Sequence, residues 1–187
     1  CAYGADVVRK HLYGLFTGQE KARIADLGNI RQGHSVDDTY FALTNVVAGL
    51  AANNIIPVII GGGQDLNYAV YRAYEHLGQI INIVSVDPQF DLGKDSSALD
   101  SRSYLSKIIL HQPNYLFNFT NIGYQSYFVD TEAVLLMERL FFDTYRLGNV
   151  RSNMDEVEPI VRNADMVSID ISAVRSADAP GNGNAIP

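Results

Sequence analysis

Residues 80–91 read Ile-Ile-Asn-Ile-Val-Ser-Val-Asp-Pro-Gln-Phe-Asp, a short apolar run that ends in two acidic residues. An apolar run of this length is typical of a strand that is covered on both faces, as in a parallel sheet. Similar runs predict further strands at 23–27, 55–60, 115–122 and 166–171. Ligands of such sheets bind beyond the carboxyl ends of the strands, so the acids that follow residue 86 are the first candidates for a site.

Segments with helical spacing of apolar residues separate these strands. The spacing predicts helices over 6–16, 36–52, 65–77, 104–111, 130–146 and 155–163. Ser35 and Asp38 form a capping-box pattern before the second helix, and Val134, Met137, Leu140 and Phe141 would be the inner face of the fifth. Because strands alternate with helices and no repeat occurs, we expect a three-layer α/β/α fold around a mostly parallel sheet.

Composition places the chain among globular proteins. Its 187 residues are 47% hydrophobic and 19% charged, and 14 Lys+Arg against 21 Asp+Glu give a net charge of −7. The acidic balance argues against a nucleic-acid partner, and no apolar run approaches the roughly 20 residues of a membrane span. The single cysteine, Cys1, excludes an internal disulfide and fits a cytoplasmic protein.

Three predicted strand exits carry polar residues. They are Gly61-Gly62-Gly63-Gln64-Asp65, the segment 87–91, and Ser168-Ile169-Asp170-Ile171-Ser172. Because the carboxyl ends of parallel strands meet at one edge, we expect Asp87, Asp91 and Asp170 to lie close together. Grouped carboxylates repel one another unless protons or a cation neutralise them, and oxygen ligands favour Mg, Mn or Ca over zinc. A single Asp at a strand end is equally typical of a turn, so the coincidence of three exits carries the inference.

Four segments, in order, resemble motifs of the ureohydrolase superfamily, which comprises arginases, agmatinases and formimidoylglutamases. These segments are Gly4-Ala5-Asp6-Val7-Val8-Arg9, the glycine-rich turn 61–65, the Asp-x-Gln-x-Asp segment 87–91, and 170–183 with its Ala179-Pro180-Gly181. The resemblance implies one arginase-like α/β/α domain over 1–187, incomplete at its C-terminus. The chain lacks a starting Met and stops within a Gly/Pro-rich segment, so we expect a fragment truncated at both ends.

Members of this superfamily hold two manganese ions that activate a bridging hydroxide. The resemblance places their six ligand positions on Gln64, Asp87, Gln89, Asp91, Asp170 and Ser172. Asp87, Asp91 and Asp170 keep a carboxylate, whereas both imidazoles and one carboxylate are replaced at Gln64, Gln89 and Ser172. A neutral Gln carbonyl is a weaker ligand than imidazole for such ions. We therefore expect no metal cofactor, or one weakly bound divalent cation, Mn or Mg.

The same resemblance places a substrate-contacting loop at 96–103, where Asp100 and Arg102 are pocket candidates. Arg102 could pair with a substrate carboxylate, and a solvated loop is the alternative reading. The expected ligand is a small guanidino or formimino compound, and the resemblance also implies a homo-oligomer. The histidines lie away from these motifs, so no catalytic residue is assigned.

Three hypotheses follow. The first is a degenerate ureohydrolase-like protein that has lost dinuclear manganese hydrolysis and acts in binding or assembly. The second is an active hydrolase of C–N bonds in formimino or guanidino compounds, with a remodelled and single-metal site. The third is an unrelated α/β protein whose aspartates coincide by accident. The sequence leaves open whether the protein is an enzyme.

Overall fold

A computed structural model describes residues 4–16, 23–93 and 98–182. Within them, a parallel sheet contains strands β1 (Ile81–Val86), β2 (Leu116–Tyr124), β3 (Asp143–Arg146) and β4 (Met166–Ile169). The strand order is β3-β2-β1-β4, and every neighbouring pair is parallel. The predicted parallel α/β architecture is confirmed. Cys1, Gly183 and part of the loop 96–103 lie outside the described residues.

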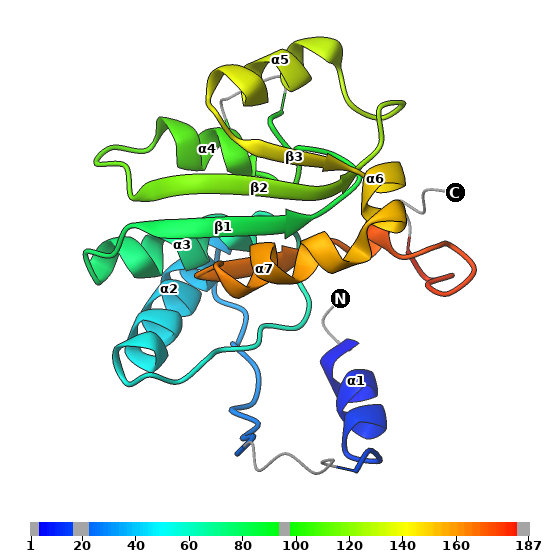
Figure 1. The fold of residues 1–187 in the computed structure, drawn as a ribbon. Coiled ribbons are helices and arrows are strands. Elements are labelled where there is room, and N and C mark those ends of the chain that lie inside the picture. The colour runs from blue at the N-terminus through cyan, green and yellow to red at the C-terminus, as the bar shows by residue number, and fades with distance from the viewer. Residues whose placement is uncertain (1–3, 17–22, 94–97, 183–187) are drawn as a thin grey trace.

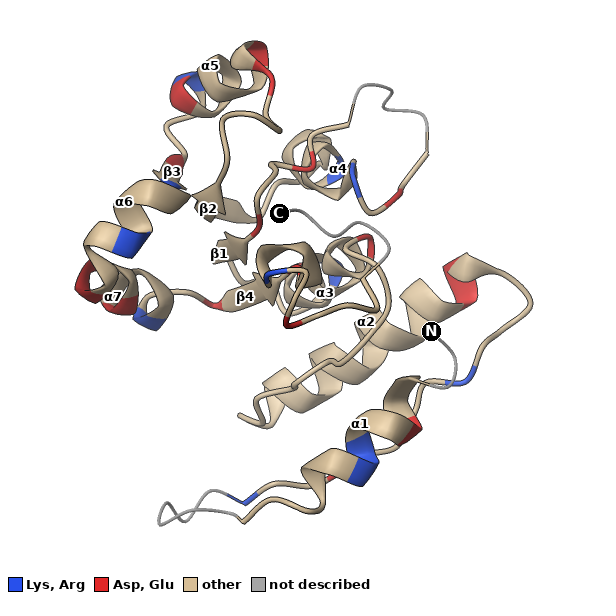
Figure 2. Cartoon of the chain, turned by 90° about the vertical axis from the view of Figure 1, so that its right-hand side faces the viewer, with Lys and Arg blue, Asp and Glu red and all other residues tan. Residues whose placement is uncertain are grey.

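Helices cover both faces of this sheet. One face carries α2 (Val36–Ala52), α3 (Leu66–His76) and α4 (Tyr104–Leu110), and the opposite face carries α6 (Leu147–Ser152) and α7 (Val157–Arg162) (Figures 1 and 2). Helix α5 (Thr131–Arg139) lies beyond the β3 edge, and α1 (Gly4–Leu12) stands apart from the sheet. Single 3-10 turns, η1 (Met154–Glu156) and η2 (Ile171–Ala173), precede α7 and follow β4.

The core forms between the sheet and the layer of α2, α3 and α4. Alternate residues of β1 point into it, and the small residues Ala69 and Ala73 of α3 are among its buried members. Its members include Leu43, Ala69, Tyr71, Ile81, Ile83, Leu105, Ile108 and Phe119. Tyr71 is fully buried, and its hydroxyl accepts the Tyr115 N–H at 2.9 Å, which fixes the start of β2 against α3. The packing of this helical layer against the sheet holds the strands, and so their carboxyl ends, in place.

Helix α2 begins where the sequence predicts. The Ser35 hydroxyl accepts the Asp38 N–H at 3.3 Å, and the Asp38 carboxylate accepts the Ser35 N–H at 2.9 Å. This reciprocal pair satisfies two of the donors that a helix start leaves free. The predicted capping box is therefore confirmed. Among the described residues, no helix combines the length and the apolar character that crossing a bilayer requires.

The strands expected at 23–27 and 55–60 do not form, so these predictions were wrong. Residues 55–60 pair with no strand among the described residues, and Ile56 and Val58 are 88% and 80% exposed. An apolar run supplies side chains for a sheet, but a strand exists only where a neighbour completes its hydrogen bonds. In 23–27, Asp26 accepts a hydrogen bond from Arg9 of α1 at 2.6 Å instead.

The helix predicted over 130–146 was wrong in its second half. Helix α5 ends at Arg139, Phe141 takes a left-handed φ of 57°, and β3 follows. The stretch Asp143-Thr144-Tyr145 is rich in residues that favour strands, and pairing with β2 decides the outcome. Met137 is buried as expected, but Phe141, assigned to the same inner face, is 89% exposed. Helix α6 was not predicted from the sequence.

The burial of Met137 can be tested against its neighbour in α5. Met137 is fully buried, whereas Leu136 is 41% exposed. We expect Met137→Ala to lower the free energy of unfolding by about 2–4 kcal/mol, because the truncation leaves a cavity, and Leu136→Ala to lower it by less than about 1 kcal/mol. Urea unfolding followed by circular dichroism measures both. Equal losses in the two variants would show that α5 does not present this face to the core.

Candidate functional site

The parallel pairing of β1 with β4 brings two predicted site residues together. Ser85 lies opposite Ser168 and Val86 opposite Ile169, so Asp87 and Asp170 leave the two strands side by side. The Asp170 N–H donates to the Val86 carbonyl at 3.0 Å and continues the ladder beyond the strands. Asp87 is 3% exposed, and Asp170 is partly buried.

Asp91 reaches the same place by a turn. It takes a left-handed φ of 52°, which returns the chain after Phe90, and its carboxyl group shares a hydrogen bond with that of Asp87. Burial is the largest effect on the pKa of both groups and raises it well above the usual carboxyl range, and the negative charge of Asp170 raises both further. The exposed Arg102 lowers the pKa of Asp91. A proton held by this pair relieves part of the repulsion that the sequence predicts.

Gln64, at the first changed ligand position, is held in a neutral hydrogen-bond network. Its side chain is 9% exposed. The Ser168 hydroxyl donates to Gln64 Oε1 at 2.7 Å, Asn67 Nδ2 also donates to Gln64 Oε1, and Asn67 Nδ2 contacts Ser168 Oγ at 2.9 Å. The carbonyl oxygen that would face a metal ion therefore already accepts two hydrogen bonds. This network joins the start of α3 to β4.

The side chains of Asp87 and Asp170 each accept a hydrogen bond from the backbone two residues later. Asp87 Oδ1 accepts the Gln89 N–H at 2.7 Å, and Asp170 Oδ1 accepts the Ser172 N–H at 2.6 Å. These are Asx turns, in which a short acidic side chain accepts the amide two residues later. Each carboxylate consequently has one oxygen engaged by its own turn and one directed elsewhere.

A buried hydroxyl from α4 reaches the strand that leads to Asp87. Tyr104 is 1% exposed and donates its hydroxyl to Ser85 Oγ at 3.3 Å. Burial raises the pKa of Tyr104, and the negative charges of Asp91 and Asp87 raise it further. Tyr104 and Asn67 were missed in the sequence, where each is one polar residue within an otherwise unremarkable helix, and Ser168 was named at a predicted strand end but given no role.

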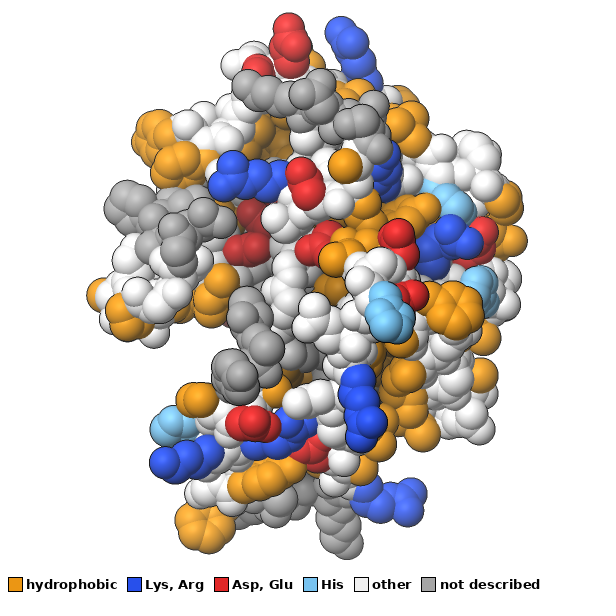
Figure 3. Space-filling model, turned by 180° about the vertical axis from the view of Figure 1, so that it is seen from behind, with side chains coloured by type: hydrophobic (Ala, Val, Ile, Leu, Met, Phe, Trp, Pro, Cys, Tyr) orange, Lys and Arg blue, Asp and Glu red, His pale blue; other side chains and the backbone are white. Residues whose placement is uncertain are grey.

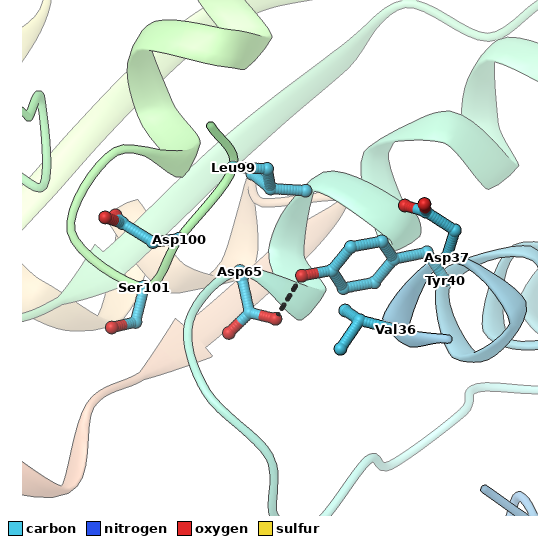
Figure 4. Close-up of a pocket in the computed structure, with 7 residues that line it drawn as sticks. All are labelled: Val36, Asp37, Tyr40, Asp65, Leu99, Asp100 and Ser101. Carbon is cyan, nitrogen blue, oxygen red and sulfur yellow. Dashed lines mark hydrogen bonds between the residues drawn. The ribbon is translucent and has the colours of Figure 1, made fainter. Parts of the chain in front are cut away.

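The loop candidate Asp100 lies beside a cavity of about 460 Å³. The cavity is lined by Val36, Asp37, Tyr40, Asp65, Leu99, Asp100 and Ser101, from α2, the glycine-rich turn and the loop (Figure 4). Tyr40 donates to Asp65 Oδ2 at 2.7 Å, and Asp65 directly follows Gln64. Seen from behind, several acidic side chains gather near the middle of the molecule (Figure 3). The carboxylates of Asp37, Asp65 and Asp100 would attract a cationic group in the cavity.

Three of the six ligand positions that the resemblance indicates carry neither an imidazole nor a carboxylate. Gln64 Oε1 is engaged by Ser168 and Asn67, and positions 89 and 172 carry an amide and a hydroxyl. Within residues 4–16, 23–93 and 98–182, no three His, Cys, Asp or Glu side chains are grouped so as to hold a metal ion. Asp87, Asp91 and Asp170 do influence one another's charge, so their role as weak ligands for a single cation stays a prediction.

The layers, the strand order and the acids at the strand ends define a class: three-layer α/β/α proteins with an acidic site at the carboxyl edge of a parallel sheet. A family model described as the arginase family matches residues 1–187. The chain belongs to the arginase family.

Curated relatives of this chain include formimidoylglutamases. That of Hahella chejuensis is 26% identical over 176 residues, which covers 84% of this chain and 53% of the relative. That of Staphylococcus carnosus is 28% identical over 104 residues, which covers 54% of this chain and 33% of the relative. The chain thus spans about half or less of the length of these relatives.

Solved structures show the same fold. The formimidoylglutamase of Bacillus subtilis superposes with a TM-score of 0.82 at 13% identity, covering 99% of this chain and 64% of that structure. A formiminoglutamase of Trypanosoma cruzi, solved with Mn²⁺, superposes with a TM-score of 0.71 at 18% identity, covering 80% of this chain and 53% of that structure. The arginase-like α/β fold expected from the sequence motifs is confirmed.

The raised pKa values predict how stability depends on pH. Because Asp87 and Asp91 bind protons more tightly in the folded chain than in the unfolded chain, their contribution is complete in acid and is lost as pH rises through the raised values, between about pH 5 and pH 9. Asp91→Asn removes one buried charge and tolerates the left-handed backbone. We expect this variant to be more stable than wild type at pH 9 by on the order of 2 kcal/mol, and to lose that advantage near pH 4.

Urea unfolding across this pH range measures the difference. Asp155→Asn, at an exposed position, serves as the control and should change stability little at any pH. An advantage of Asp91→Asn that grows toward acid would show that these carboxyl groups are not stabilised by protonation.

Proposed function

We propose that this formimidoylglutamase-like chain has lost dinuclear manganese hydrolysis and binds a small guanidino or formimino compound at the strand ends. The observation that carries the proposal is the state of Gln64, whose carbonyl oxygen accepts hydrogen bonds from Ser168 and Asn67. A side chain engaged in this way holds the fold together rather than presenting a free ligand to a cation.

The loss has a direct chemical consequence. A bound metal lowers the pKa of water from 15.7 toward about 7 and so supplies hydroxide at neutral pH. Positions 64, 89 and 172 are the ones at which the family resemblance expects two imidazoles and a carboxylate, and none of these groups is present. Without them, this route to a nucleophile is lost, and among the described residues no histidine forms a hydrogen bond or ion pair with Asp87, Asp91 or Asp170.

The remaining charges still suit a cationic ligand. Asp87, Asp91 and Asp170 lie at one edge of the sheet, and Asp65 and Asp100 line the adjoining cavity. Amidinium and guanidinium groups pair with carboxylates through parallel hydrogen bonds, so both ligand classes match this chemistry. Arg102, close enough to Asp91 to lower its pKa, could receive a carboxylate of the same ligand.

A second function is favoured by the mutual influence of the three aspartates. If they hold one hard cation, the protein would be a hydrolase with a single-metal site. In either case we propose a cytoplasmic protein that forms a homo-oligomer and binds neither nucleic acid nor membrane, in keeping with its net charge of −7.

Metal analysis separates the two functions. We expect the purified protein that contains this chain, dialysed against Mn²⁺, to retain less than one equivalent by elemental analysis, because the ligands that relatives use are replaced. We expect no turnover of arginine or agmatine in a urea assay, and none of formimidoylglutamate in an assay of released glutamate and formamide. Two tightly bound ions would refute the proposal, and turnover that Asp87→Ala abolishes would establish the hydrolase.

Restoring the ligands provides the reciprocal test. The triple variant Gln64→His, Gln89→His, Ser172→Asp should bind Mn²⁺ at least about tenfold more tightly than wild type, measured by isothermal titration calorimetry. A matched variant places the same residue types at exposed positions, as Gln79→His, Gln112→His, Ser152→Asp, and should leave affinity unchanged. Equal affinities in the two triple variants would show that these positions do not surround a metal site.

A further inference from the structure

A buried amide on β2 lies directly beside the turn that carries the acids. Asn121 is 0% exposed, and its register partner on β1 is Ser85, two residues before Asp87. Asn121 Nδ2 donates to the Asp87 carbonyl at 3.2 Å and to the Gln89 carbonyl at 3.0 Å. Both hydrogens of one nitrogen therefore hold the same turn.

The other half of this amide has no partner. Asn121 Oδ1 is buried and accepts no hydrogen bond from any described residue. Burying an unpaired polar oxygen is unfavourable, because the oxygen loses its hydrogen bonds to water, and an apolar side chain of similar size would avoid this cost. The unpaired oxygen of Asn121 therefore lowers the stability of the core. The favourable contribution of this side chain is the pair of hydrogen bonds that it donates to the turn.

The turn is held at three consecutive carbonyl groups. Asn121 takes those of Asp87 and Gln89, and the Gln125 N–H donates to the carbonyl of Pro88, between them, at 3.0 Å. Gly123, with a φ of 97° at an irregularity in the β2 register, lets the chain bend so that Gln125 reaches this position. These hydrogen bonds fix the backbone conformation of residues 87–89, and this conformation sets the position of Asp91 two residues later.

We propose that Asn121 is a positioning residue for the carboxylate site. By fixing the carbonyl groups of residues 87 and 89, it directs the Asp87 side chain and returns the chain so that Asp91 meets it. A primary amide is suited to this because one nitrogen supplies two donors, whereas Asp or Leu at this position supplies none. The inference rests on the proposed function only in taking these carboxylates as the ligand-binding groups.

Asn118 provides a matched control on the same strand. It is partly exposed, and its Nδ2 donates to the Asp143 carboxylate at 2.8 Å, away from the turn. Replacing it by Leu removes an amide from β2 without touching residues 87–91.

The test is native-state hydrogen exchange of the Gln89 and Gln125 amides, followed by NMR. In Asn121→Leu we expect protection of both amides to fall about tenfold more than that of Ile83 and Val84 in β1, since local opening of the turn loses its main restraint. Asn121→Ser, which keeps one donor, should give a smaller loss and remains informative if the Leu variant does not fold. In Asn118→Leu the two amides should follow the rest of the sheet. Unchanged protection in the Asn121 variants, or a loss spread evenly over β1 and β2, would overturn the proposal.

Ligand binding gives the second readout. With agmatine and formimidoylglutamate as probes, the dissociation constant of Asn121→Leu should rise at least about tenfold, while that of Asn118→Leu stays at the wild-type value. If neither compound binds the wild-type protein, the proposed ligand class fails, and the exchange measurement still decides the role of Asn121. If both bind the Asn121 variants as tightly as wild type, Asn121 does not position the site.

Discussion

The parallel pairing of β1 with β4 is the constraint on which the site depends. It sets Asp87 beside Asp170, although more than eighty residues separate them in the chain, and the hydrogen bond from the Asp170 N–H to Val86 carries the pairing up to the acids themselves. Helices α3 and α4 then close the inner face, so that Asp87 is almost completely buried. The carboxyl groups of Asp87, Asp91 and Asp170 therefore lie where water screens their charge poorly. The raised pKa values of Asp87 and Asp91 follow from this burial.

Such a group of carboxylates requires neutralisation. In this chain, burial and mutual repulsion raise the pKa of Asp87 and Asp91, which favours a bound proton on the pair, and the Asx turns at Asp87 and Asp170 supply amide hydrogens to one oxygen of each carboxylate. The junction between α3 and β4 is held without any charge, by Gln64, Asn67 and Ser168.

Below the acids lies a row of small and polar side chains that shapes the turns. Ser168, Ser85 and Asn121 occupy equivalent register positions on three adjacent strands, and Thr144 continues the row on β3. Asn121 donates to the turn 87–89, and Ser85 accepts from Tyr104 of α4. Ser168 donates to Gln64, which lies just before α3. Each of these three side chains is thus hydrogen-bonded to a different neighbour of the row. The positions of the aspartates at this edge therefore depend on the hydrogen bonds of Ser85, Asn121 and Ser168 as well as on the aspartates themselves.

The sequence by itself determined the alternation of strands and helices, the capping box at Ser35 and the residues that follow β1 and β4, because these depend on local periodicity and short-range hydrogen bonds. It could not decide whether 55–60 is a strand or where the helix after Asp130 ends, because those outcomes depend on a pairing partner far away in the chain. The same reason explains the missed site residues. Asn121 and Tyr104 carry no motif, and Ser168 was named only as part of a strand end. Only the tertiary structure, by packing β2, β4 and α4 around β1, brings these polar residues together beside the acidic strand ends.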